Sequence, residues 1–310
     1  MQIYASFFLG QAYYAIGDYV RANELLRRNV EVADRESDTA SIDLLTRSRA
    51  WLTWSLSDLG AFVEGQRHGE EALRRATMEG RGSAPILTSA CLGFLYLTKG
   101  DLGHAIRVFD QGLALCRASG NQDTLRPIVA GLGYSYALRG DLAEGRVLLE
   151  EGISESTRTG ALGHLACWVA WLSEVCRLAG HGEEAGQHAR QALDLARQHK
   201  ERGNEALALH QLGVVYAHAD PPDAAQAEGH YHQALALAET LAMRPLQSHC
   251  HWGLGRLYAA IGQREQARTE LSAAIELYRA MEMTFWLPQT ESALAQVEVQ
   301  SHARHTRRAT

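Results

Sequence analysis

One turn residue recurs along this chain at a nearly constant interval, and this period constrains the fold more than any other feature. The successive spacings are 43, 40, 40, 40, 40 and 42 residues, and a leucine lies eight positions before each turn. The seven turn residues are Gly17, Gly60, Gly100, Gly140, Gly180, Asp220 and Gly262. A fixed period of this length is typical of helical repeat arrays, in which each unit buries its apolar face against its neighbours. We therefore expect 310 residues to form one elongated array rather than one compact core.

The third copy, SACLGFLYLTKGDLGHAIRVFDQGLAL, indicates what each unit is. Small residues such as Gly93 and Ala105 allow two helices to approach closely, and large apolar residues fill the remaining space between them. Gly100 suits a left-handed helix end, and Asp101 suits the start of the next helix. Each unit is therefore predicted to be a pair of antiparallel helices.

These residues resemble the signature of the tetratricopeptide repeat, and the last copy repeats the pattern from Leu254 to Ala274. The resemblance implies an all-α, right-handed α-solenoid of seven tetratricopeptide-like helix pairs and a C-terminal capping helix. The family repeat has 34 residues, so the longer period here predicts longer second helices. The expected boundaries place a single domain at 1–300, with repeats at about 1–36, 37–80, 81–120, 121–160, 161–200, 201–242 and 243–282, a capping helix at 284–298 and a disordered tail at 301–310.

Residues 254–296 resemble, more narrowly, the final repeat and cap of bacterial signalling proteins that join a P-loop ATPase to a tetratricopeptide tail. Some members of that group carry an adenylate cyclase domain, and others end in a DNA-binding domain, as maltose-regulator-type activators do. The resemblance implies that this chain is the sensor or docking tail of such a protein. Met1 lies directly within the first predicted helix, without a polar capping segment, so we expect the chain to be a fragment.

Composition and motifs exclude several classes of function. A net charge of -6 gives little electrostatic support for binding nucleic acid. No signal peptide, uninterrupted apolar span or CxxC pair occurs, so we expect a cytoplasmic protein with reduced cysteines and no membrane contact. Because no GxxxxGK[ST], GxSxG or HExxH motif occurs either, we expect no enzymatic activity and no cofactor. The i,i+2 histidine pairs point to different helix faces and predict no metal site.

The concave face of the solenoid is the candidate binding surface. In the family, the residue two positions after the recurring leucine points into the groove, which places Trp54, Phe94 and Tyr134 there as a ladder at 40-residue steps. We expect these rings to be exposed in the free protein, since clustered surface aromatics mark contact sites. The alternative is that they pack between repeats. The C-terminal half of the same face is polar, and its candidate residues are Glu174, Arg177, His210, Trp252 and Arg256.

The leading hypothesis is a protein-interaction or ligand-sensing scaffold that binds a peptide, a partner domain or an effector in this groove. The scaffold would be the regulatory tail of a longer ATP-dependent signalling protein. One alternative is an intramolecular autoinhibitory scaffold that holds an upstream ATPase or cyclase domain. An enzyme with an unrecognised groove site is the weakest alternative, because no base, nucleophile and orienting group can be placed together.

Overall fold

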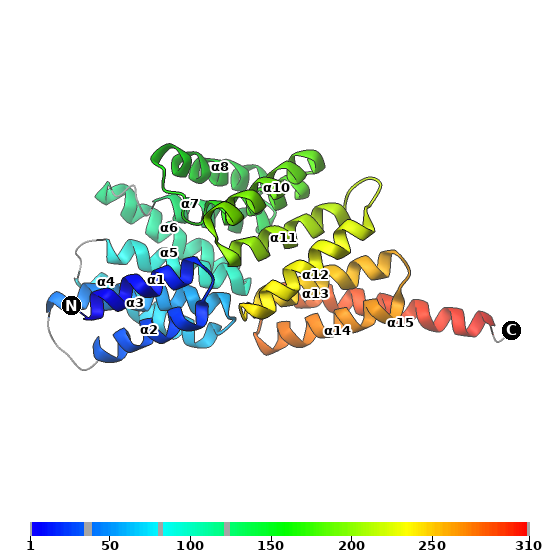
Figure 1. Ribbon diagram of the computed structural model, residues 1–310, viewed down its shortest axis with the longest axis horizontal. Helices are drawn as coiled ribbons and strands as arrows, with labels where there is room; N and C mark the ends of the chain where they lie inside the picture. Colours follow the sequence, from blue (N-terminus) through cyan, green and yellow to red (C-terminus); the bar gives the residue numbers. More distant parts are fainter. Residues whose placement is uncertain (1, 34–38, 80–82, 121–124, 309–310) are drawn as a thin grey trace.

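The computed structural model describes residues 2–33, 39–79, 83–120 and 125–308 (Figure 1). Helices make up the regular secondary structure of these residues, and no strand occurs among them, which confirms the all-α prediction. Seven antiparallel pairs, α1/α2 to α13/α14, stack into a right-handed solenoid that α15 completes. The helices are α1 Gln2–Ala15, α2 Tyr19–Ala33, α3 Thr39–Asp58, α4 Phe62–Glu79, α5 Ala84–Lys99, α6 Leu102–Ser119, α7 Leu125–Arg139, α8 Leu142–Thr159, α9 Leu165–Leu178, α10 Gly182–His199, α11 Arg202–Ala217, α12 Ala224–Thr240, α13 Arg244–Ala260, α14 Arg264–Ala280 and α15 Leu287–Arg308.

The recurring glycines form the turns within the pairs, as predicted. Gly100 has a φ of 87°, and its N–H donates to the carbonyl oxygen of Leu97 at 3.0 Å. The side chain of Asp101 accepts a hydrogen bond from the backbone N–H of His104 and so caps α6. Only glycine adopts a left-handed φ without steric cost, which explains why the turn residue recurs along the sequence. The sixth copy differs because its Pro221 and Pro222 lengthen the turn between α11 and α12.

Close helix crossings require the small residues of the repeat. A Cβ atom on Gly133 of α7 would lie 2.7 Å from the carbonyl oxygen of Gly145 and 2.9 Å from Cβ of Leu148, both on α8. A Cβ atom on Gly93 would lie 2.5 Å from the ring of Phe109. Neither position has room for a side chain, which confirms the packing role predicted for these glycines.

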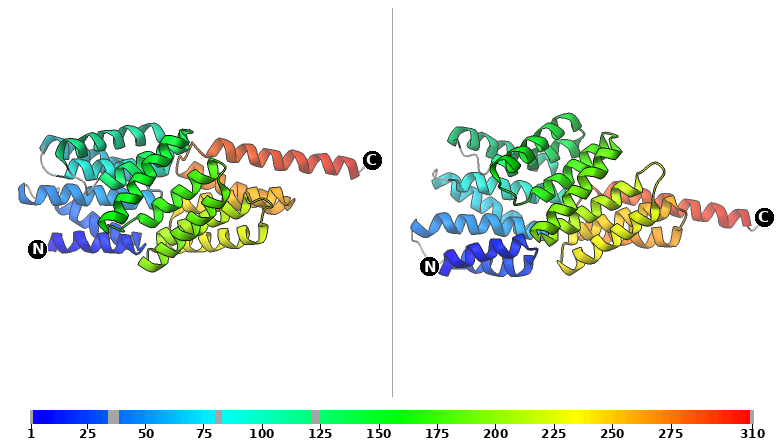
Figure 2. Two further views of the ribbon diagram at one scale, coloured as in Figure 1. Left: turned by 90° about the horizontal axis from the view of Figure 1, so that it is seen from above. Right: turned by 45° about the horizontal axis from the view of Figure 1, so that its top comes forward.

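The array turns back on itself, so that its first repeats contact its last ones (Figures 1 and 2). Lys99 at the end of α5 forms an ion pair with Glu282, which follows α14, at 3.2 Å. A Cβ atom on Gly60 would meet Cγ of Met281 at 3.3 Å, and α3 contacts α13 directly. These contacts join residues separated by most of the chain, and they place the first helices of the pairs around a common interior.

The terminal helix α15 is longer than the predicted cap at 284–298. It begins at Leu287, runs to Arg308 and projects from the body of the molecule (Figure 2). Residues 301–308, predicted to be disordered, are therefore helical, and 309–310 lie outside the described residues. No glycine or proline occurs in the sequence after Pro288, so no helix-breaking residue ends α15 earlier. None of the helices in the described ranges is long and apolar enough to span a bilayer.

Candidate functional site

A cavity of about 630 Å³ lies inside the turn of the solenoid, lined mainly by the first helices of the pairs. All eight residues that the sequence assigns to the concave face line this one cavity: Trp54, Phe94, Tyr134, Glu174, Arg177, His210, Trp252 and Arg256. The eight residues therefore lie together around one space. That these residues bind a partner stays a prediction.

The aromatic ladder is packed rather than open. The ring of Trp54 stacks on Phe94 at a centroid distance of 4.4 Å and on His164 at 4.5 Å, and Tyr134 stacks on Trp171 at 4.7 Å. Trp54 is 9% exposed and Phe94 is 3% exposed, whereas Tyr134 is half-buried. The expected exposure is therefore wrong for Trp54 and Phe94. The reason is the curvature of the array, which carries the fifth repeat onto the face of the second, third and fourth.

His164 and Trp171 were missed by the sequence analysis. His164 precedes α9 with a φ of 66°, and burial lowers the pKa of its imidazole to about 4, so the ring is neutral. It lies in the connection between α8 and α9, outside the series of positions that follow the recurring leucines. Trp171 lies three residues before Glu174 on α9, and this helical spacing was the one sequence signal that it shares the face.

Asp58 is a third cavity residue that the repeat pattern did not predict. It is the last residue of α3 and lines the cavity, where its Oδ2 accepts a hydrogen bond from the hydroxyl of Tyr14 at 2.9 Å. No basic side chain of the described residues forms an ion pair with it. Burial raises the pKa of the Asp58 carboxyl to about 7, and the Tyr14 hydrogen bond opposes this rise.

Charged residues follow the aromatic region towards the outside. On α9, Arg177 donates through two nitrogens to the Glu174 carboxylate at 2.7 and 3.2 Å, so these two charges compensate each other. On α13, the guanidinium of Arg256 lies 5.3 Å from the centre of the Trp252 ring. Arg256 is exposed, as are the lining residues His218 and Ile261, which indicates that the cavity opens near them.

Three buried polar atoms of cavity-lining residues have no hydrogen-bond partner: Nδ1 of His210, Oε1 of Gln211 and Nε1 of Trp252. Leaving a buried donor or acceptor unpaired costs on the order of 1 to 3 kcal/mol, and such groups are few in native proteins. Burial also lowers the pKa of His210 to about 4, so its ring is neutral. Clustered around one cavity, these atoms are suited to hydrogen bonds with a bound molecule.

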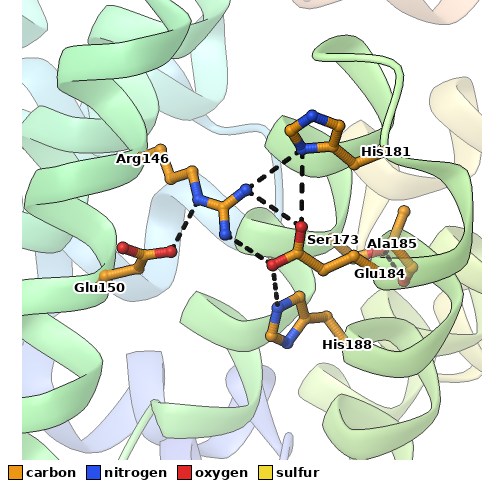
Figure 3. Close-up of polar contacts among 7 residues, drawn as sticks. All are labelled: Arg146, Glu150, Ser173, His181, Glu184, Ala185 and His188. Atoms are coloured by element: carbon orange, nitrogen blue, oxygen red, sulfur yellow. Dashed lines mark hydrogen bonds and ion pairs between the residues drawn. The ribbon is translucent and has the colours of Figure 1, made fainter.

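A cluster away from this cavity is the one grouping with metal-ligand geometry among the described residues. Ligand atoms of Cys176, Glu184 and His188 lie within 4.8 Å of one another. Arg146, however, binds both oxygens of Glu184 at 2.6 and 3.0 Å and also Glu150 at 2.7 Å (Figure 3). Burial raises the pKa of the Cys176 thiol to about 11, whereas a metal requires the thiolate. The cluster is therefore best described as an ion-pair network that joins α8 to α10.

Two segments of the chain match the family model described as tetratricopeptide repeat, at residues 129–151 and 248–273. The first covers parts of α7 and α8, and the second covers parts of α13 and α14. No curated protein matches the sequence.

Several solved structures share the fold. The Rap conjugation gene regulator of the plasmid pLS20, solved in complex with the Phr* peptide, superimposes with a TM-score of 0.70 at 18% identity, over 91% of this chain and 76% of that chain. A Rap protein complexed with Competence and Sporulation Factor has a TM-score of 0.70 at 14% identity, and the match covers 97% of this chain and 87% of that chain. A signal transduction ATPase with a tetratricopeptide repeat sensor from Pyrococcus horikoshii has a TM-score of 0.56 at 14% identity, and the match covers 89% of this chain and 43% of that chain. At these identities the similarity establishes the fold alone.

Proposed function

Because this chain is a right-handed solenoid of tetratricopeptide repeats, we propose that it is a regulatory binding module that takes a short peptide into its internal cavity. The chain acts by binding, without a reaction of its own. A volume of about 630 Å³ lies within the range of roughly 300 to 1,000 Å³ typical of ligand pockets. A peptide segment or small effector fits such a space, whereas a folded domain would have to bind elsewhere.

The observation that carries this proposal is the combination of aromatic walls and unpaired polar atoms in one cavity. The rings around Trp54 and Trp171 offer apolar contact area, and the free atoms of Gln211 and Trp252 offer an acceptor and a donor. Peptide recognition requires both features, because the backbone must be hydrogen-bonded while side chains fill apolar pockets. A surface without a ligand would leave these buried groups unpaired.

The comparisons support a regulatory setting. One structure of the same fold is a gene regulator in complex with a peptide, and another carries its tetratricopeptide repeats as the sensor of a signal transduction ATPase. We place this chain in the second setting, as the sensing tail of a longer ATP-dependent signalling protein. Ligand binding in the cavity would then change how the tail contacts its ATPase.

The proposal is tested by affinity selection. The full chain is incubated with a pool of random hexapeptides, separated from free peptide by size exclusion, and the retained peptides are identified by mass spectrometry. Ala260→Trp closes the cavity near its opening, because Ala260 lines the cavity and is exposed. We expect this variant to keep its helical circular dichroism and to lose retention at least about tenfold.

The matched control is Ala236→Trp, which adds the same ring at an exposed position of α12 that does not line the cavity. This variant should retain peptides as the unmodified chain does. If the unmodified chain retains no peptide, or if Ala260→Trp retains the same peptides equally well, the cavity is not the peptide site.

A further inference from the structure

Asp58 is a carboxyl group at the wall of an aromatic cavity without a counter-charge. Its one hydrogen-bond donor within the described residues is the neutral hydroxyl of Tyr14, at 2.9 Å. Burial raises the pKa values of Tyr19 and Cys167, and the negative charges of Asp58 and Glu201 raise them further. Two carboxylates thus act on the same neighbours, and neither forms an ion pair with a described basic residue. This end of the cavity therefore carries negative charge above a pH of about 7, where the Asp58 carboxyl is ionised.

The backbone increases this negative potential. Asp58 is the last residue of α3, where the helix dipole places partial negative charge that favours a cation and disfavours a carboxylate. An acidic residue at this position is unfavourable for the free protein, because burial and the dipole both oppose its ionisation. A cation bound at this point would offset both effects.

The rings beside Asp58 are suited to the same kind of group. The centre of the Tyr14 ring lies 5.5 Å from that of Trp51 and 5.7 Å from that of Trp54, and His164 stacks on Trp54. Because Trp54 is already stacked on Phe94 and His164, these rings offer an apolar wall for the stem of such a group rather than a free face for its charge. The neutral His164 ring adds contact area without adding positive charge.

A second acceptor elsewhere in the cavity is suited to the same kind of group. Gln211 is 4% exposed, lines the cavity, and its Oε1 accepts no hydrogen bond. Together with the Asp58 carboxyl, which has no ion-pair partner among the described residues, it makes the cavity receptive to N–H donors.

We propose that the ligand of this cavity carries an ammonium or guanidinium group, which forms an ion pair with Asp58 while its apolar stem packs against Trp54 and His164. This inference rests on the proposed peptide function and specifies the peptide as basic. Its charged group is a lysine or arginine side chain or a free N-terminal amine, because these are the cations that a peptide offers at neutral pH.

The test uses N-acetylated hexapeptide pools in which one position at a time is fixed as lysine or as its uncharged analogue norleucine. Binding to the full chain is followed by tryptophan fluorescence at pH 8. We expect at least one lysine pool to bind about tenfold more tightly than the matching norleucine pool. Asp58→Asn should remove this preference while leaving the norleucine pools bound as before. Asp194→Asn, the same substitution at an exposed position of α10 that does not line the cavity, should keep the preference.

A small probe separates the inference from the peptide proposal. Phenethylammonium should quench the tryptophan fluorescence of the unmodified chain at concentrations about tenfold lower than phenethyl alcohol does, and Asp58→Asn should abolish the difference. If peptides bind but the lysine and norleucine pools bind equally and phenethylammonium shows no preference over phenethyl alcohol, the cation site is refuted and the peptide function stands. If no peptide binds while phenethylammonium shows the expected preference, the peptide function fails and the cation site stands. If phenethylammonium and phenethyl alcohol bind the unmodified chain alike, Asp58 is not a cation site.

Discussion

Gly133 offers the sharpest test of the packing described above. In Gly133→Ala the new Cβ atom would lie 2.7 Å from the carbonyl oxygen of Gly145 and 2.9 Å from both Cβ of Leu148 and the backbone nitrogen of Leu149. Comfortable contacts of this kind need about 3.5 Å, so α7 and α8 must separate by roughly 0.6 to 0.8 Å. No rotamer change relieves the clash, because the opposing atoms belong to the backbone or are attached directly to it.

Overpacking of this kind costs about 1 to 3 kcal/mol, and we expect a value near the upper end because three contacts are violated together. Replacing a helical glycine by alanine returns up to about 1 kcal/mol, so the net loss is about 2 kcal/mol. The control is Gly103→Ala on α6, where a Cβ atom meets nothing within 4 Å, and which should gain up to about 1 kcal/mol.

The assay is urea unfolding followed by far-ultraviolet circular dichroism, with the midpoints of the two variants compared at matched slopes. Repeat arrays can unfold in more than one step, so a biphasic curve is analysed by its first transition. A Gly133→Ala protein as stable as Gly103→Ala would refute the close approach of α7 and α8.

Three further predictions concern the cavity. Trp54→Ala should lower the free energy of unfolding by about 3 to 5 kcal/mol in urea titrations, because it removes a ring stacked on three others. A change below about 1 kcal/mol would mean that the ring is not packed as described. The carboxyl of Asp58 has a pKa of about 7 in the folded chain and about 3.9 in the unfolded chain, so the folded chain binds more protons between these values. The free energy of unfolding should therefore fall by up to about 4 kcal/mol as the pH rises from about 4 to about 7. Asp58→Asn should remove this fall when stability is measured against pH, and an unchanged profile would contradict the burial of Asp58. His249 has the opposite dependence, because its pKa of about 3 in the folded chain lies below its unfolded value of about 6.5. Its contribution to the free energy of unfolding is therefore lost as the pH falls through this range. His249→Phe should reduce the loss of stability at acid pH, and an unchanged loss would show that His249 is solvated.

The helix pairs could be predicted because they depend on interactions between neighbours in sequence. The turn at Gly100 and Asp101 requires a left-handed residue and a helix cap, and both are visible as residue types. The crossing at Gly133 likewise follows from a missing side chain at a fixed offset from the turn. The end of α15 was less predictable, because a polar helix without a breaker resembles a disordered tail in composition.

The cavity residues were predictable only as a set on one face. The 40-residue period places Trp54, Phe94 and Tyr134 at equivalent positions of consecutive repeats, and they do share a wall. Whether that wall is open depends on how the small rotation between successive repeats accumulates over the whole array. That sum is not encoded in any single repeat, so the sequence left exposure and burial of the ladder as alternatives.

The sequence by itself determined the helices, their pairing and the common orientation of the first helices, because each of these follows from contacts within one repeat or between adjacent repeats. Only the tertiary structure decided that repeats one and two meet repeats five to seven, which brings His164 onto Trp54 and leaves Asp58 facing a cavity. The physical reason is that closure of the superhelix is a property of the assembled array. It converts a surface that the period predicts to be a groove into an interior, where desolvation changes the pKa of a carboxyl group and the exposure of an aromatic ring.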